Sequence, residues 1–394
     1  MSDTANPKTE GYSPGLEGVL AGETALCEID EARSGLRYRG YAIEDLAEQA
    51  SFEEVAHLLL LGTLPTRKDL EDFSAQLRSQ WLLPGPVEAF LGVMAPDAHP
   101  MDILRTGVSL LGMADRDAAD GSREAQEVRN AHEVNVQKSI RLLAQIPVLI
   151  SSTYRVLHGK RPVQPRADLT FSENLLYLLT DRHDDATARA MARVLNVSLI
   201  LYTEHEFNAS TFAARVAAST LTDLHAAITA AIAALKGPLH GGANEAVAAM
   251  LTEIRSPERA EGWIRRALSQ KQRVMGFGHR VIKTEDVRSR IIRRHAEALS
   301  RLSGEMRWYE IATILARVML EEKGLHPNLD FYTAVAYLVM EIPPDVYTPV
   351  FVCSRITGWC AHVIEQQDHN RLIRPRALYT GPPPLRYVPI DQRT

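Results

Sequence analysis

Apolar side chains recur every three to four residues along most of the chain, a spacing that places them on one face of an α-helix. The clearest segments are residues 51–62, 66–81, 132–158 and 186–204. Strand-like alternation is confined to residues 17–45, where LRYRGYAI is typical of a small hairpin. The pattern predicts an all-α fold with a minor β element near the N-terminus.

Two of these segments also carry the residues that begin and end helices. Ser51 precedes two acids and is followed by Gly62 as a stop signal, and Thr66 and Asp69 have the spacing of a capping box. These signals predict the first residues of both helices.

Two other segments interrupt the helical pattern. The alanine-rich run 210–237 is expected to break between Thr220 and Asp223. The stretch RPRALYTGPPPLRYVP, residues 374–389, holds too many prolines and glycines for a helix. We expect it to wrap a surface or another subunit.

Composition narrows the class of protein. A chain of 394 residues is longer than one simple core requires, which favours one large or two unequal domains. The net charge of −5 argues against nucleic acid as the main partner, although a local basic cluster could still bind a small anion. The odd number of cysteines without a CxxC pair, the absence of an apolar leader and the absence of an 18-residue apolar run predict a soluble cytoplasmic protein without a membrane span.

Basic residues are concentrated in one segment. Residues 265–294 contain ten Lys or Arg and only two acids, Glu285 and Asp286. This segment is either a solvated helix face or a site for phosphates or carboxylates, which arginine binds with two parallel hydrogen bonds.

Two histidines lie among glycines. His240 is in GPLHGGANE, residues 237–245, and His279 is in GFGHRVIK, residues 276–283. Glycine allows a ligand to approach the backbone closely. The GxG of the second motif is not a dinucleotide fingerprint, because no βαβ unit surrounds it.

Three more side chains could take part in chemistry. His205 lies between two acids near the end of an apolar helix, where the alternative is a capped helix end with a satisfied imidazole. Asp330 lies between Leu329 and Phe331, where burial would raise its pKa toward the range of a general base; the alternative is an N-cap. Arg355 begins an apolar stretch, and it either pairs with a buried carboxylate or binds a ligand.

The spacing of these residues excludes two kinds of site. His205, His240 and His279 are far apart in the chain and show no metal-ligand motif such as HExxH. No GxSxG elbow is present for a serine nucleophile. The remaining set of histidines, an aspartate and arginines suits proton abstraction next to a carbonyl, with a polycarboxylate held by the arginines.

Several longer motifs together resemble the citrate synthase family over nearly the whole chain. They are EHEFNASTF, LKGPLHGGANE, MGFGHRV, PNLDFYT, YTPVFVCSRITGW and RPRALYTGP, in the family's order and spacing. The resemblance implies an all-α, two-domain homodimer that closes on its substrates. Residues 1–235 and 337–394 would form the large domain, and residues 236–336 the small one.

The resemblance also implies catalytic roles. Asp330 would take a proton from the α-carbon of an acyl-CoA, His240 would hydrogen-bond the thioester oxygen, and His279 would donate to the carbonyl of oxaloacetate. Water would then hydrolyse the CoA thioester intermediate. No metal or tightly bound cofactor is required.

Substrate-binding residues follow in the same way. The resemblance places oxaloacetate against His205, Arg288 and Arg355, with Arg374 contributed by the other subunit. The residues matching the CoA side of the family's site are Gly276, Phe277, Gly278 and Lys283. Two positions depart from the family's pattern: Ile282 replaces an aromatic residue and Val287 replaces a proline, so we expect a less rigid loop before Arg288.

Other pieces indicate a branch of the family. AGETALC (21–27), FEEVAHLLLLGTLPTR (52–67), HPMDILRTGVSLLG (99–112) and the ending LYTGPPPLRYVPIDQR resemble 2-methylcitrate synthases, which use propionyl-CoA, more than citrate synthases, which use acetyl-CoA. One methylene group is worth only about 1–3 kcal/mol of discrimination, so we expect both activities. A non-catalytic helical scaffold is the alternative of another class, and an ATP-driven citrate-cleaving enzyme is disfavoured because the chain has no P-loop.

Overall fold

The computed structural model describes residues 12–30, 35–115, 127–279 and 284–393. Its contacts form two units: one comprises the described parts of Met1–Glu23 and Leu372–Thr394, and the other is Thr24–Arg371. Every candidate site residue that is described, except Arg374, belongs to the second unit. The predicted domain boundaries at 235/236 and 336/337 stay a prediction.

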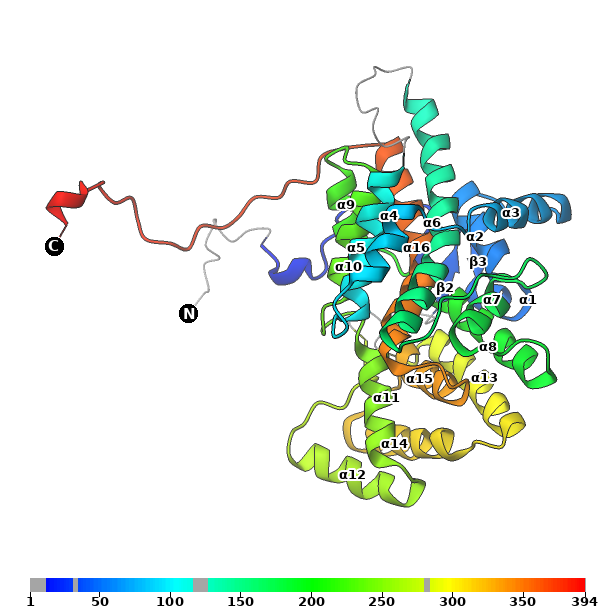
Figure 1. Cartoon of the computed structure of the whole chain (residues 1–394). Coiled ribbons are helices and arrows are strands. Elements are labelled where there is room, and N and C mark those ends of the chain that lie inside the picture. The colour runs from blue at the N-terminus through cyan, green and yellow to red at the C-terminus, as the bar shows by residue number, and fades with distance from the viewer. Residues whose placement is uncertain (1–11, 31–34, 116–126, 280–283, 394) are drawn as a thin grey trace. The chain divides into compact units, whose positions relative to one another are not determined.

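Helices account for most of the described chain, which confirms the all-α prediction (Figure 1). The first eight are α1 Ile43–Gln49, α2 Phe52–Leu61, α3 Arg67–Ser79, α4 Gly85–Val93, α5 Pro100–Ala114, α6 Glu127–Leu157, α7 Phe171–Thr180 and α8 Ala186–Tyr202. The other eight are α9 Ala209–Ala218, α10 Leu224–Leu235, α11 Ala243–Ile254, α12 Pro257–Ser269, α13 Val287–Ser303, α14 Arg307–Lys323, α15 Leu329–Val339 and α16 Tyr347–Asp368.

The predicted hairpin is also present. The strands are β1 Cys27–Asp30, β2 Gly35–Tyr38 and β3 Tyr41–Ala42, antiparallel and in that order. Tyr38 pairs with Tyr41 across a tight turn in which Arg39 and Gly40 both have positive φ, the geometry that suits two-residue hairpins.

The capping signals determine the helix ends as predicted. The Ser51 hydroxyl accepts from the Glu54 N–H, the Glu54 carboxylate accepts from the Ser51 N–H, and Gly62 ends α2 in the left-handed conformation. Thr66 and Asp69 form the same box at the start of α3. The alanine-rich run breaks after Ala218, as expected.

Helix α16 lies at the centre of the second unit. Every residue from Tyr347 to Ile364 is buried, and the helix packs against α2, α6, α8, α9 and α10. A helix enclosed on all sides is apolar all round, so each polar side chain on it needs a partner or a ligand. Its two cysteines, like Cys27, are free and buried.

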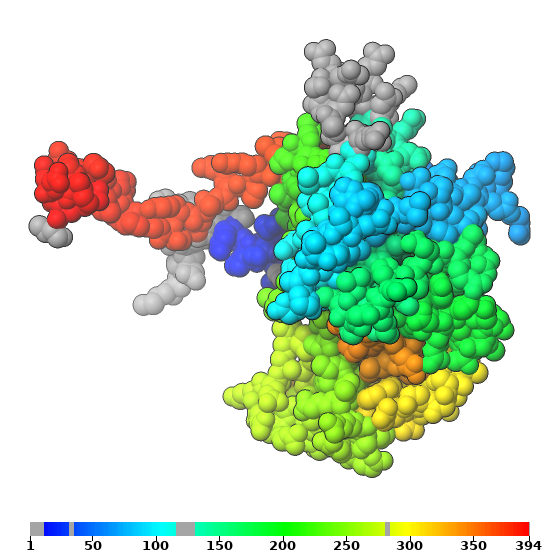
Figure 2. Space-filling model, in the orientation of Figure 1, coloured from blue at the N-terminus to red at the C-terminus, as the bar shows by residue number. Residues whose placement is uncertain are grey.

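Helix packing brings the candidate segments together. Helix α13 packs against α15 and α8, and α11 packs against α15 and α16. Helices α8, α13 and α15 therefore contact one another, and α8 also packs on α16. Helix α12 lies at the surface of the same unit, packed on α14 (Figures 1 and 2). Among the described residues, no helix has the length and apolarity needed to cross a membrane.

Candidate active site

Asp330 is a buried carboxylate held by one phenol. It lies in the first turn of α15, and the N-cap of that helix is Asn328, whose side chain accepts from the Asp330 N–H at 3.1 Å. The Tyr202 hydroxyl, at the end of α8, donates to Asp330 Oδ1 at 2.6 Å. Burial raises the pKa of Asp330, and the Tyr202 hydrogen bond works against this shift. The carboxylate is therefore not the cap, and its geometry suits a general base.

The His240 ring is held in one tautomer. Two groups of Ser210 face His240 Nε2: the hydroxyl oxygen at 2.8 Å, and the backbone N–H, which can only donate, at 3.2 Å. Burial lowers the pKa of His240 to about 4, so the ring is neutral at pH 7. A neutral ring that accepts at Nε2 carries its proton on Nδ1. His240 therefore offers a single N–H donor on the side away from Ser210.

The glycines around His240 have two different causes. A Cβ at Gly241 would lie 2.5 Å from the Leu235 carbonyl oxygen, so that glycine is required by packing against the end of α10. A Cβ at Gly242 would meet nothing within 4 Å. The expectation that glycine makes room for a ligand here therefore holds for Gly242 and not for Gly241.

His205 and His279 face each other across a short gap. Their ring centroids are 4.9 Å apart in an edge-to-face arrangement. His205 lies three residues beyond the end of α8 and is 7% exposed, and its Nε2 has no hydrogen-bond partner in the described part of the chain. Burial lowers the pKa of His205 well below its ordinary value, and the positive charge of Arg288 adds to this shift. A buried polar atom without a partner is expected where a ligand completes the site.

The two arginines are buried in different ways. Arg288 donates through Nε and Nη2 to the two oxygens of Asp286, at 3.1 and 2.8 Å. Burial alone would raise the pKa of Asp286, but Arg288 outweighs it and lowers that pKa. Val287, the residue that replaces the family's proline, is buried in the first turn of α13. Arg288 is thus oriented by a carboxylate two residues before it.

Arg355 connects the candidate residues. It is 2% exposed, and its Nε donates to the Tyr202 carbonyl oxygen at 2.6 Å. Its positive charge helps to lower the pKa of His240 and of His205. The same charge opposes the rise that burial causes in the pKa of Asp330. Three side chains that are far apart in sequence therefore share one electrostatic environment around this guanidinium.

The segment before His279 is joined to the start of α15. The Gly278 N–H donates to the His326 carbonyl, the Asn328 N–H donates to the Gly276 carbonyl, and the Asn328 side chain donates to the Gly278 carbonyl. Gly276 has φ +84, and a Cβ there would lie 2.8 Å from the Phe331 ring. These contacts couple the position of His279 to that of Asp330.

The remaining predicted residues are not all described. Lys283 and Ile282 lie outside the described residues. Arg374 is exposed and belongs to the other unit. The Phe277 ring packs on Phe331, with centroids 4.6 Å apart. Within the described ranges, no three His, Cys, Asp or Glu side chains are arranged to hold a metal ion.

Sequence reasoning missed the residues that hold the others in place. Tyr202, Ser210 and Asp286 each contact a candidate residue directly. Ser210 is in the motif EHEFNASTF that contains His205, Tyr202 lies two residues before that motif, and Asp286 is one of the two acids in the basic segment. The partners of Tyr202 and Ser210 lie far along the chain, whereas Asp286 contacts Arg288, two residues after it.

Known proteins match this chain over almost all of its length. The model of the family "Citrate synthase, C-terminal domain" matches residues 15–376. Citrate synthase 2 of Bacillus subtilis is 45% identical over 380 residues, covering 96% of this chain and 98% of its own. The 2-methylcitrate synthase of Shewanella oneidensis is 44% identical over 382 residues, covering 96% and 97%.

A solved structure also matches this chain over almost all of its length. It is the ternary complex of carboxymethyl coenzyme A and oxaloacetate with citrate synthase from Thermoplasma acidophilum. The TM-score is 0.87 at 35% identity, and the match covers 97% of this chain and 99% of that one. The likeness therefore extends to the fold as a whole.

Proposed function

Because the chain belongs to the citrate synthase family, whose members condense an acyl-CoA with oxaloacetate, we propose that its preferred reaction is the synthesis of 2-methylcitrate from propionyl-CoA, oxaloacetate and water. Citrate synthesis from acetyl-CoA is the slower second activity. The observation that carries the chemistry is that a buried carboxylate, Asp330, and a neutral histidine, His240, both feel the charge of the buried Arg355.

In the first step Asp330 takes a proton from the α-carbon of the acyl-CoA. A general base works best when it is unprotonated and its pKa lies near the working pH. Burial raises the pKa of Asp330 toward that range. Negative charge develops on the thioester oxygen, where the Nδ1–H of His240 donates a hydrogen bond.

In the second step the α-carbon attacks the keto carbon of oxaloacetate. His279 donates to the keto oxygen as it becomes a hydroxyl, while His205, Arg355 and Arg288 hold the two carboxylates. The unpartnered Nε2 of His205 and the terminal amino groups of Arg355, which have no hydrogen bond among the described residues, support this assignment. Arg374 of the partner subunit completes the binding of oxaloacetate in a homodimer.

In the last step water attacks the thioester carbonyl, the C–S bond breaks, and CoA leaves as a free thiol. The residues proposed for the CoA side are Gly276, Phe277, Gly278 and Lys283. No step needs a metal or a bound cofactor, so chelator treatment should leave the rate unchanged.

The sequence segments support propionyl-CoA as the preferred substrate, and steady-state kinetics tests this preference. Relatives named for each activity match this chain at 45% and 44% identity, so overall similarity does not discriminate. We would follow thiol release with oxaloacetate and either propionyl-CoA or acetyl-CoA, using Asp330→Asn as the inactive control. A higher kcat/KM for propionyl-CoA is the expected result, and a higher value for acetyl-CoA would make the protein a citrate synthase.

A further inference from the structure

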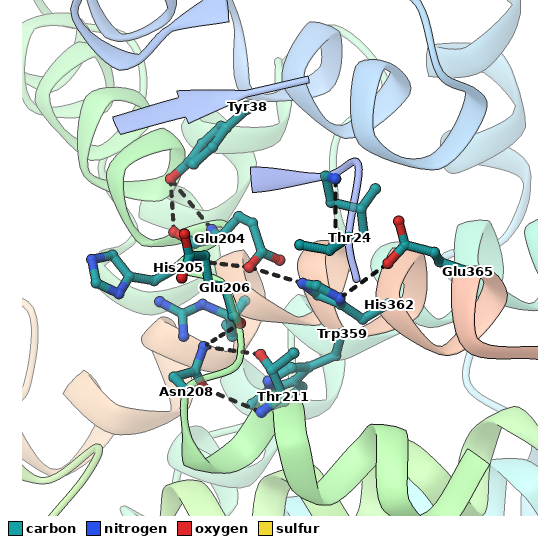
Figure 3. A network of polar contacts seen from close by, with 12 residues as sticks. Thr24, Tyr38, Glu204, His205, Glu206, Asn208, Thr211, Trp359, His362 and Glu365 are labelled. Atoms are coloured by element: carbon teal, nitrogen blue, oxygen red, sulfur yellow. Dashed lines mark hydrogen bonds and ion pairs between the residues drawn. The ribbon is translucent and has the colours of Figure 1, made fainter. Parts of the chain in front are cut away.

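Trp359 lies on the buried helix α16 and directs its only polar group toward the start of α9. It is the largest fully buried side chain among the described residues. A buried indole N–H needs an acceptor, and Trp359 Nε1 donates to Ser210 Oγ at 3.1 Å. Figure 3 shows the Trp359 side chain beside Asn208 and Thr211 at the start of α9. The indole therefore binds a serine that also contacts His240.

The Ser210 hydroxyl is the meeting point of three groups. Besides the indole N–H, its Oγ lies 2.8 Å from His240 Nε2 and 2.8 Å from Asn208 Oδ1. A hydroxyl has one proton and two lone pairs, and the indole, which can only donate, occupies a lone pair. Both other partners are acceptors, since Asn208 Oδ1 takes the backbone N–H of Thr211 and His240 Nε2 takes that of the serine itself. The hydroxyl proton is therefore directed to the side on which these two acceptors lie.

His240 is supported by one fixed group and by one group that can rotate. The Ser210 backbone N–H, 3.2 Å from Nε2, is fixed by the first turn of α9. The Ser210 hydroxyl can turn about the Cα–Cβ bond between three staggered rotamers. In the observed rotamer Oγ lies against Nε2, and the contacts to Trp359 and Asn208 hold it there. The rotating half of the support for His240 is therefore set from α16.

We propose that Trp359, acting through the Ser210 hydroxyl, is a positioning residue that orients the His240 imidazole for the acyl-CoA thioester. The inference rests on the proposed function, in which the His240 Nδ1–H donates to the thioester oxygen. Without the indole N–H the hydroxyl loses one of its three partners, and its contact with Nε2 weakens. The imidazole is then held less firmly, so formation of the enolate slows, while oxaloacetate, which is bound by other residues, keeps its affinity.

The test begins with Trp359→Phe in the full-length protein, which keeps an aromatic ring in the core and removes the donor. We expect kcat with propionyl-CoA and oxaloacetate to fall about fivefold, the usual effect of one neutral hydrogen bond, with the KM for oxaloacetate unchanged. Trp263→Phe is the matched control and should keep the wild-type kcat. It removes an indole N–H that donates to Glu253 Oε1 at 2.7 Å, between α12 and α11, which carry no candidate site residue.

A double-mutant cycle separates a positioning role from a purely structural one. Ser210→Ala removes the hydroxyl and keeps the backbone N–H that donates to His240. If the indole acts through this hydroxyl, adding Trp359→Phe to Ser210→Ala lowers kcat no further. If Trp359 only fills the core, Trp359→Phe lowers kcat by the same factor in both backgrounds.

Three results would overturn the proposal: an unchanged kcat in Trp359→Phe, an equal fall of kcat in both backgrounds, or a rise in the KM for oxaloacetate that accompanies the fall. Circular dichroism checks that each variant is folded. If Trp359→Phe does not fold, 3-benzothienylalanine incorporated at position 359 keeps the bicyclic shape, has sulfur in place of the N–H, and gives the same comparison with the same outcomes. A wild-type protein without thiol release would refute the proposed function itself, and the positioning role with it.

Discussion

At the scale of single residues, the chemistry depends on how neighbours tune two groups. Burial raises the pKa of Asp330, and the Tyr202 hydrogen bond limits that rise. Burial lowers the pKa of His240 to about 4, and the Ser210 N–H selects its tautomer. The Tyr202 effect comes from one identifiable contact, so a single substitution can remove it.

Tyr202→Phe tests the contact to the base. Without the phenol the pKa of Asp330 rises further, so a larger share of the enzyme has a protonated base at a given pH. The acidic limb of the kcat/KM profile should move to higher pH, and kcat should fall about tenfold or more. Steady-state rates between pH 5 and 9 measure both, and an unshifted acidic limb would contradict the assignment of Asp330.

Asp330→Asn removes the base itself. The amide is close in size and can still accept from Tyr202, so the fold should persist, while turnover falls by roughly a thousandfold or more. Circular dichroism and calorimetric binding of CoA provide the control for folding. Near-normal turnover in this variant would show that another group takes the proton.

His240 links stability to pH. Its folded pKa of about 4 lies below the unfolded value of 6.5, so the unfolded chain binds a proton first as pH falls. The stabilisation is complete above pH 6.5 and is lost toward pH 4, by at most about 3 kcal/mol. Urea unfolding at several pH values should show a shallower decline for His240→Gln than for the wild type, and parallel curves would argue against a buried neutral ring.

At the scale of elements, one cap serves two parts of the site. Asn328 begins α15 by accepting from the Asp330 N–H, and it also donates to the Gly278 carbonyl next to His279. The capping box at the start of α2, by contrast, makes no such second contact to a candidate residue. The dual use of Asn328 makes this helix start functional as well as structural.

Asn328→Asp separates the two uses. The aspartate retains the acceptor for the helix cap but cannot donate to Gly278. We expect a melting temperature close to that of the wild type and a kcat lowered about tenfold, because His279 is no longer held relative to Asp330. Asn328→Ala should lower both. An unchanged kcat in Asn328→Asp would show that the Gly276–Gly278 backbone pairings suffice.

At the scale of the whole molecule, the proposed homodimer makes a specific prediction about Arg374. If this arginine enters the partner's active site, Asp330→Asn and Arg374→Ala homodimers are both impaired, but a mixed dimer contains one site with neither change. Unfolding and refolding an equal mixture should then restore about one quarter of wild-type activity. Activity no higher than the average of the two parents would place Arg374 in its own subunit's site.

Much of the fold follows from local sequence. The 3.6-residue apolar period, the boxes at Ser51 and Thr66 and the turn at Arg39 and Gly40 predict helices, helix starts and the hairpin, because each depends on residues close together in the chain. The motifs around His240, His279 and Asp330 likewise identify the family before any packing is known.

The tertiary structure decided what surrounds these residues. Tyr202 and Asp330 are 128 residues apart in the chain, and Tyr202 and Arg355 are 153 apart, so no local pattern pairs them. The pKa of Asp330 and the tautomer of His240 depend on burial and on donors from other parts of the chain. Sequence alone determined which groups are available and on which elements they lie, whereas packing around α16 determined their charge, orientation and contacts, because electrostatics and hydrogen bonding depend on distance in space and not along the chain.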